Sequence, residues 1–272
     1  MTAVSAKAAA RDVAPWVEIL ARIGYIAKAT LYGTIGLLAA QAALGRGGRA
    51  TDTRGALRAL LEAPFGRVLL LVIAGGLAGY ALWRLVEAIT DPERRGADAK
   101  AVAMRVGNAV RGLAHGALAL AAFRLGTGHG GGGSRGPDGW TARVFALPAG
   151  EALVWIGAAV VAGYGAYQIY RAWRAKLGRH LALTQVSART AAVLVGICRF
   201  GLAARGAVFL LIGFFLARAA EKHDPHQAGG VRESLLTLAG FGRWALGAVA
   251  LGLIAYGVFQ LVEARYRRID VA

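Results

Sequence analysis

The sequence has little cysteine, few acidic residues and little charge of any kind. Its single cysteine, Cys198, excludes an intramolecular disulfide framework and a cysteine-rich metal site. Only 17% of the 272 residues are charged, whereas 57% are hydrophobic and the mean hydropathy is +0.50. A soluble domain with a balanced surface is more polar than this. The composition therefore indicates a chain that lies in a lipid bilayer.

The scarcity of acids leaves 32 Lys and Arg against 15 Asp and Glu, a formal net charge of +17. On a soluble chain this excess would suggest nucleic acid as a partner. Here the basic residues fall in loops and near helix ends, where they anchor membrane spans against anionic headgroups, and no basic and aromatic nucleic-acid module is present. We expect membrane lipids, anionic ones included, as partners and no nucleic acid.

Long apolar runs recur along the chain. A membrane-spanning helix needs about 20 residues to cross about 30 Å of hydrocarbon. Six runs are predicted to be such helices, at residues 19–44, 66–89, 103–125, 150–173, 190–218 and 242–264. The first is longer than the apolar core of a signal peptide, which favours a retained span. Residues 1–15 are small, polar and weakly basic, and we expect them to be disordered.

The six runs pair into three copies of one unit. The first helices align on Gly24, Gly107 and Gly201, and the second helices align on Gly66, Gly150 and Gly242. Each second helix has one aromatic residue 14 positions after its glycine and another three positions later: Tyr80 and Trp83, Tyr164 and Tyr167, Tyr256 and Phe259. Glycines and tyrosines in register indicate an internal repeat. We predict one all-α membrane domain of three helical hairpins, at residues 16–93, 101–177 and 188–268, with approximate threefold symmetry.

A shorter segment connects the two helices of each pair. In the first copy, leucines that include Leu57 and Leu60 fall on one helical face and Arg58 falls on the other. Residues 231–238 repeat this pattern, and residues 140–145 follow it less regularly. We expect three short amphipathic helices at the membrane interface, as connecting chain rather than as a lipid-sensing or partner-binding device.

The motifs of the first copy are Leu20-Ala-Arg-Ile-Gly-Tyr25, Gly55-Ala-Leu-Arg-Ala-Leu, Pro64-Phe-Gly66 and Gly79-Tyr-Ala-Leu-Trp-Arg84. In these motifs the chain resembles a bacterial membrane protein family of unknown function that is built from three tandem repeats of a transmembrane helix pair. The resemblance covers nearly the whole chain. It implies the fold and the membrane location, and the family brings no established activity.

Both termini are expected on one side of the membrane, because the predicted number of spans is even. That side carries more Lys and Arg near the spans than the opposite side does. The positive-inside tendency therefore predicts a multi-pass protein of the bacterial inner membrane with both termini in the cytoplasm.

Charged residues also lie inside the predicted spans. Each first helix has one cation six residues beyond a boundary arginine, about 9 Å deeper at 1.5 Å per residue: Lys28, Arg111 and Arg205. The second helices return to the same depth with Arg84, Glu87, Arg171 and Glu263. A lone cation at the bilayer centre costs about 2.5 to 3.5 kcal/mol on insertion scales, so these residues should face the bundle interior or extend toward the cytoplasm.

The middle copy departs from this charge pattern. Arg171 stands where the other copies have Glu87 and Glu263, so Arg111 has no equivalent acidic neighbour. One interpretation of the charged layer is a set of interhelical ion pairs that fixes how the hairpins meet. The other is an anion-receptive vestibule, formed by the surplus of cations, for a lipid phosphate or a small permeating anion.

Other polar features indicate no known chemistry. His115 lies near mid-bilayer, where a packing hydrogen-bond donor is commoner than a proton relay. The glycine-rich segment 126–134 lacks the strand and the Gly-Lys-Ser/Thr of a phosphate loop, and we interpret it as a flexible tether. His223 and His226 have no further His or Cys to complete a metal set. No catalytic constellation emerges, so we expect no enzyme, metal or cofactor.

The sequence therefore favours a non-enzymatic membrane scaffold or accessory subunit. The alternative is a channel or transporter for a small solute or ion, such as an anion or a proton, lined by the first helix of each repeat. Each repeat begins and ends on the same side, so the inverted-repeat motion of many secondary transporters does not follow.

Overall fold

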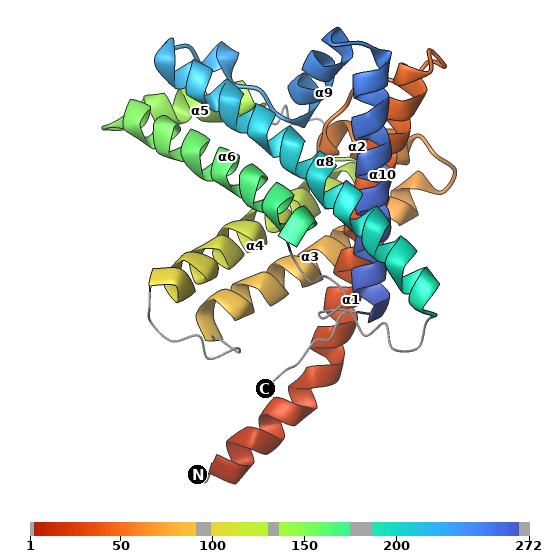
Figure 1. The fold of residues 1–272 in the computed structure, drawn as a ribbon. Coiled ribbons are helices and arrows are strands. Elements are labelled where there is room, and N and C mark those ends of the chain that lie inside the picture. Colours follow the sequence, from red (N-terminus) through yellow and green to blue (C-terminus); the bar gives the residue numbers. More distant parts are fainter. Residues whose placement is uncertain (1–2, 91–98, 130–135, 175–186, 267–272) are drawn as a thin grey trace.

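The computed structural model describes residues 3–90, 99–129, 136–174 and 187–266 (Figure 1). Within these ranges every regular element is helical, as the sequence predicts. The elements are α1 (Ala3–Ala43), α2 (Thr53–Leu61), α3 (Gly66–Thr90), α4 (Ala99–Gly126), α5 (Pro137–Phe145), α6 (Gly150–Arg174), α8 (Ala188–Glu221), the 3-10 helix η2 (Pro225–Gln227), α9 (Val231–Gly240) and α10 (Arg243–Tyr266). The ends of the predicted repeats at residues 91–93, 175–177 and 267–268 lie outside the described residues.

The long helices match the predicted apolar runs closely at the second helix of each repeat and extend beyond them at the first. The largest extension is in α1, which begins at Ala3 and so includes most of residues 1–15, where disorder was expected. The physical reason lies in the composition of this segment, because it is rich in alanine, the strongest helix former.

Five of the helices are long and apolar enough to cross a membrane: Arg22–Ala43, Gly66–Ile89, Gly150–Arg174, Ala188–Glu221 and Arg243–Tyr266. They indicate a multi-pass membrane protein. The sixth predicted span, residues 103–125, lies within α4, which has 28 residues but is less apolar than the other five. Asn108, Arg111 and His115 interrupt its apolar surface. The predicted count of six spans is therefore not confirmed.

The repeats interlock in a cyclic order. The second helix of each repeat packs against the first helix of the next, so that α3 packs on α4, α6 on α8, and α10 on α1 (Figure 1). Small residues meet at the same place in each pair, directly after the cation of one helix and directly after the tyrosine of the other. These contacts join Gly112 to Ala81, Gly206 to Gly165, and Ala29 to Gly257. The sequence repeat thus produces the same contact between small residues in all three helix pairs.

Within a repeat, the two long helices pack together in the first and third copies but not in the second. α1 packs on α3 and α8 packs on α10. Across the described residues, α4 and α6 have no comparable contact, and Figure 1 shows them diverging toward the left of the view. The prediction that each pair forms a hairpin is therefore wrong for the middle copy, whose two helices pack on neighbouring repeats instead of on each other.

The aligned glycines of the first helices differ in how closely they are packed, in the same way as the helix pairs do. A Cβ atom on Gly24 would collide with the Cβ of Tyr80, and one on Gly201 would collide with the backbone nitrogen of Tyr256. Around Gly107 the nearest neighbour of an added Cβ is the Arg111 guanidinium, at 3.8 Å. One glycine of the repeat is thus a helix crossing point in two copies, and in the third it meets no other helix among the described residues.

The three connecting helices form as predicted and lie toward the end of the molecule opposite the start of α1 and the end of α10 (Figure 1). Leu57 of α2 and Leu235 of α9 are fully buried, each within an apolar cluster formed with the long helices. A tight turn follows α2 and α5, where a Cβ on Gly66 or Gly150 would collide with the carbonyl oxygens that end the connecting helix. α2 and α9 are therefore held to the long helices by buried leucines.

We expect Gly24→Ala and Gly201→Ala each to destabilise the protein by about 1–3 kcal/mol, because the added methyl group has no room between crossing helices. Gly107→Ala is expected to be neutral, or stabilising by about 0.5–1 kcal/mol, since alanine favours the helix and its methyl group would make only an ordinary contact with Arg111, at 3.8 Å. The free energy of unfolding of each variant in detergent, compared with that of the natural protein, tests the three expectations. Equal losses would contradict the open arrangement of the middle repeat.

Candidate functional site

Lys28 of α1 is buried among aromatic rings, with 6% of its surface exposed. Its Nζ lies 3.4 Å from the hydroxyl oxygen of Tyr80, to which it donates a hydrogen bond. The same atom lies 4.5 Å from the centroid of the Tyr80 ring and 5.4 Å from that of Tyr25. A cation over an aromatic face is attracted by the negative face of the ring. Tyrosine therefore takes the place of the acidic partner that the sequence suggested.

Arg84 of α3 completes this cluster from the second helix of the same repeat. Its Nε donates to the Tyr80 hydroxyl at 2.9 Å, and one terminal nitrogen lies 3.4 Å from the Tyr25 hydroxyl. Its other terminal nitrogen forms an ion pair with Glu87, 2.5 Å away and one turn along the same helix. Glu87 thus neutralises the arginine of its own helix, while the Tyr80 hydroxyl accepts hydrogen bonds from two cations.

Arg205 of α8 lies in the most complete aromatic cage. Its Nε donates to the Tyr32 hydroxyl at 2.9 Å and a terminal nitrogen donates to the Tyr164 hydroxyl at 3.3 Å. Four rings from four different helices surround its guanidinium at centroid distances of 4.5 to 5.6 Å: Tyr32, Tyr164, Phe209 and Tyr256. The cage joins all three repeats at one buried charge.

Arg111 of α4 is held more loosely than the other two. It is half-buried, and it donates to the side-chain oxygen of Asn108 on its own helix at 3.2 Å. Its guanidinium lies 5.8 Å from the centroid of the Tyr164 ring. His115, one turn further, bonds through Nδ1 to the Arg111 carbonyl oxygen at 2.8 Å and packs edge-on against Tyr80. His115 thus takes part in helix packing.

One rule connects the three cations. In every repeat, the cation of the first helix lies over the tyrosine that follows the glycine of the second helix by 14 residues. The pairs and their distances are Lys28 and Tyr80 at 4.5 Å, Arg111 and Tyr164 at 5.8 Å, and Arg205 and Tyr256 at 4.9 Å. The sequence already places these tyrosines in register with the cations, and this register is the signal from which the pairing could have been found. We call these residues, with Arg84, the cation–tyrosine layer.

The remaining predicted residues lie around this layer. Glu263 of α10 and Arg171 of α6 are half-buried near the last turn of their helices, at the position that Glu87 occupies in α3. Gln168 and Gln260, which align with Arg84, are fully buried, and the Nε2 atom of each has no hydrogen-bond partner among the described residues. Two donors next to the layer, those of Gln168 and Gln260, are therefore not satisfied by the described part of the protein.

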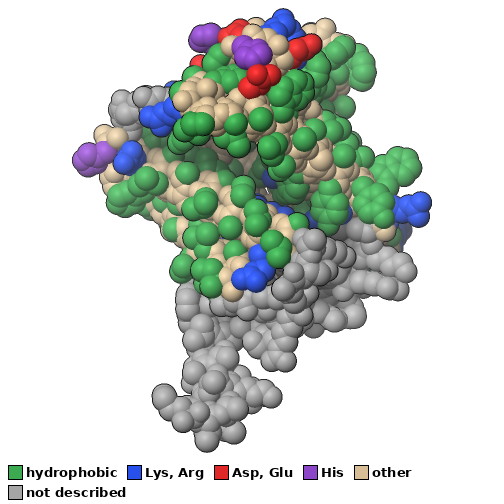
Figure 2. All heavy atoms as spheres, turned by 90° about the vertical axis from the view of Figure 1, so that its left-hand side faces the viewer, with side chains coloured by type: hydrophobic (Ala, Val, Ile, Leu, Met, Phe, Trp, Pro, Cys, Tyr) green, Lys and Arg blue, Asp and Glu red, His purple; other side chains and the backbone are tan. Residues whose placement is uncertain are grey.

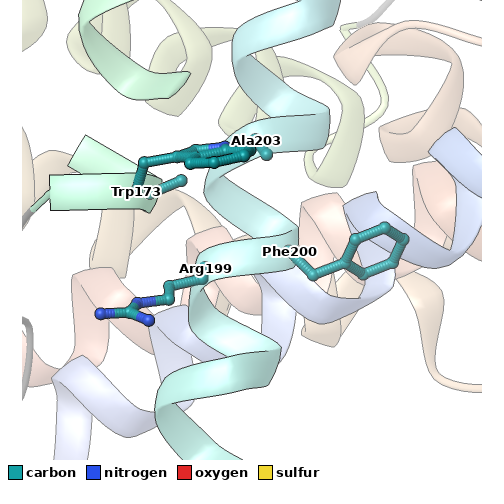
Figure 3. A pocket seen from close by; sticks show the side chains of 5 residues that line it. Trp173, Arg199, Phe200 and Ala203 are labelled. Carbon is teal, nitrogen blue, oxygen red and sulfur yellow. The ribbon is translucent and has the colours of Figure 1, made fainter. Parts of the chain in front are cut away.

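A separate pocket of about 300 Å³ lies between the end of α6 and α8, lined by Ala172, Trp173, Arg199, Phe200 and Ala203 (Figure 3). The Trp173 indole extends across to Ala203, and the Arg199 side chain leaves α8 about one turn away (Figure 3). None of the residues predicted for the site lines this pocket.

The two histidines considered for a metal have structural contacts. His223 bonds to the carboxylate of Glu151 at 2.6 Å, and the backbone N–H of His226 donates to Asp224, which caps η2. Hydrogen bonds from the Gln227 side chain and the His226 backbone hold the pKa of Asp224 below its usual range. Within the described ranges, no three His, Cys, Asp or Glu residues gather in a way that could hold a metal ion.

Tyr80→Phe is expected to destabilise the protein by about 1–3 kcal/mol, because Lys28 and Arg84 lose a shared acceptor inside the bundle. The matched control is Tyr170→Phe, since Tyr170 lies on α6 with 61% of its surface exposed and should change stability by less than about 0.5 kcal/mol. Unfolding in detergent compares the two. Equal stability of the two variants would show that the Tyr80 hydroxyl does not stabilise the bundle.

Comparison with known proteins reproduces the division into three copies. The family described as Domain of Unknown Function (DUF1206) matches residues 23–91, 106–175 and 200–267, one match for each predicted repeat. The chain is also similar to the uncharacterized protein YxxB of Bacillus subtilis (strain 168), with 31% identity over 259 residues that make up 94% of each chain. No solved structure matches.

Proposed function

Because the chain belongs to this family of unknown function, its role has to be inferred from its own residues, and we propose a non-enzymatic scaffold or accessory subunit of the bacterial inner membrane. The observation that carries the proposal is the closed packing around the buried cations. Lys28, Arg84 and Arg205 are each less than 10% exposed. Rings, hydroxyls and one ion pair satisfy them, which supports a structural role for the layer better than an aqueous pathway.

The proposal includes α4 as a sixth span. At 1.5 Å per residue its 28 residues extend about 42 Å, longer than the hydrocarbon core. α4 packs along α3, itself a candidate span, and directs large apolar side chains outward. These exposed residues are Val102, Val106, Val110, Leu113, Leu120 and Phe123. A polar inner face and an apolar outer face are what a span at the edge of a bundle requires.

Six spans predict that both termini lie on one side of the membrane, and the excess of Lys and Arg on that side predicts the cytoplasm. Fusions of a fluorescent protein that folds only in the cytoplasm, and of a phosphatase active only outside it, report the side of each terminus. We expect fluorescence and no phosphatase activity at both ends. Opposite results at the two ends would leave five spans and exclude α4 from the membrane-crossing set.

The scaffold proposal predicts that the purified protein does not conduct ions. Liposomes containing it should release chloride and protons no faster than protein-free vesicles, because Lys28, Arg84 and Arg205 are buried among their partners. Impermeability, together with one partner that copurifies in a fixed ratio, would support the scaffold. Reproducible flux in the natural protein that is lost in Arg111→Gln would reject the scaffold proposal and favour a channel or transporter.

A further inference from the structure

The middle repeat has an open seam between α4 and α6. In the other two repeats the corresponding helices cross at a glycine and a tyrosine, Gly24 with Tyr80 and Gly201 with Tyr256. In the middle repeat the nearest described atom to a Cβ added on Gly107 is a guanidinium nitrogen of Arg111, at 3.8 Å, so no tyrosine of α6 crosses there. Figure 2 looks onto this side of the molecule and shows a hollow in a largely apolar surface, with Lys and Arg atoms visible inside it. The seam therefore leads from the outer surface toward the cation–tyrosine layer.

Positive charge gathers along this seam. Arg111 lies on its α4 side, half-buried, with a neutral amide oxygen and an aromatic ring as its contacts. Arg171 lies on α6, two turns beyond Tyr164 and on the same helical face, where the other repeats have an acid. Two half-buried guanidinium groups in an apolar setting are costly without an anion nearby.

A neutral donor lies between Tyr164 and Arg171 along α6. Gln168 is one turn beyond Tyr164 on α6 and only 2% exposed, and its Nε2 has no acceptor among the described residues. Buried donors are nearly always hydrogen-bonded in proteins. In the middle repeat α6 thus carries a cation, Arg171, and a hydrogen-bond donor, Gln168 Nε2, that has no acceptor among the described residues.

The surroundings of the seam fit a lipid better than a free ion. α4 exposes Val106 and Val110 on its outer surface, and α6 exposes Ile156 and Val160. An occupant that enters from the side must cross this apolar surface and bring negative charge to the depth of Arg111. A phospholipid has both parts, since its acyl chains match apolar helix surfaces and its phosphate accepts hydrogen bonds from arginine.

We propose that the seam between α4 and α6 binds an anionic phospholipid, with Arg111 and Arg171 as ligands of its phosphate. The first and third repeats offer no such site, because their helix pairs are closed at the glycine–tyrosine crossing and Glu87 or Glu263 stands where the middle repeat has Arg171. The site is a property of the one repeat that departs from the pattern in both charge and packing.

The test uses the full chain in a mild detergent, with thermal unfolding followed as phosphatidylglycerol or phosphatidylcholine of the same acyl chains is added. We expect phosphatidylglycerol to raise the unfolding temperature at concentrations at least about tenfold lower than phosphatidylcholine does, a difference of about 1.4 kcal/mol. Arg111→Gln should abolish this preference. Arg124→Gln, at the other end of α4, is the matched control and should keep it.

A second variant keeps the test decisive if Arg111→Gln fails to fold. Gly107→Phe places a ring beside Arg111 without removing any charge, so the protein should remain folded and lose the phosphatidylglycerol effect. Inorganic phosphate is added in parallel. Stabilisation by phosphate alone would identify a free-anion site and overturn the lipid proposal. Equal responses to the two lipids would also overturn the proposal. So would an equal loss of the phosphatidylglycerol preference in Arg111→Gln and Arg124→Gln, because it would indicate general attraction of anionic lipids to a basic protein.

Discussion

The structure depends on a cation held against a tyrosine ring inside an apolar bundle. A carboxylate partner would bring its own desolvation cost into the membrane, whereas tyrosine offers a polarised ring face and a hydroxyl acceptor without a second charge. Lys28 with Tyr80 and Arg205 with Tyr256 use this solution. Each pair fixes the depth at which two helices meet. Gly24 and Gly201 allow it, because they let the tyrosine backbone approach the first helix.

The sequence predicts the helices, the three copies and the depth of the cations, because glycines, tyrosines and basic residues recur at equal spacing. It does not predict which partner each cation chooses. Glu87 and Tyr80 lie on the same helix, and either could be the partner of Lys28. Only the packed structure shows that Glu87 forms an ion pair with Arg84, while Lys28 lies over the Tyr80 ring. Nor could Gly107 reveal the open seam, since it aligns with two glycines that are tightly packed.

The departures of the middle copy are related to one another. His115, Arg171 and the less apolar surface of α4 all fall in the repeat whose helices separate. A hairpin that closed at Gly107 would bring Arg111 and Arg171 toward each other without an acid between them, and their repulsion opposes such closure. The first and third repeats, joined by α1 and α10, form the closed part of the bundle. α4 and α6 extend from it, each packed on a neighbouring repeat.

The contact between α1 and α10 has a consequence for how the protein is made. These are the first and last long helices of the chain, and the Arg22 side chain bonds to the carbonyl oxygen of Ala264 across them. During synthesis α1 enters the membrane long before its partner exists. The Arg205 cage likewise stays incomplete until Tyr256 emerges. The α1–α10 contact therefore forms only after α10 has been made, so loss of α10 would leave α1 without its principal neighbour.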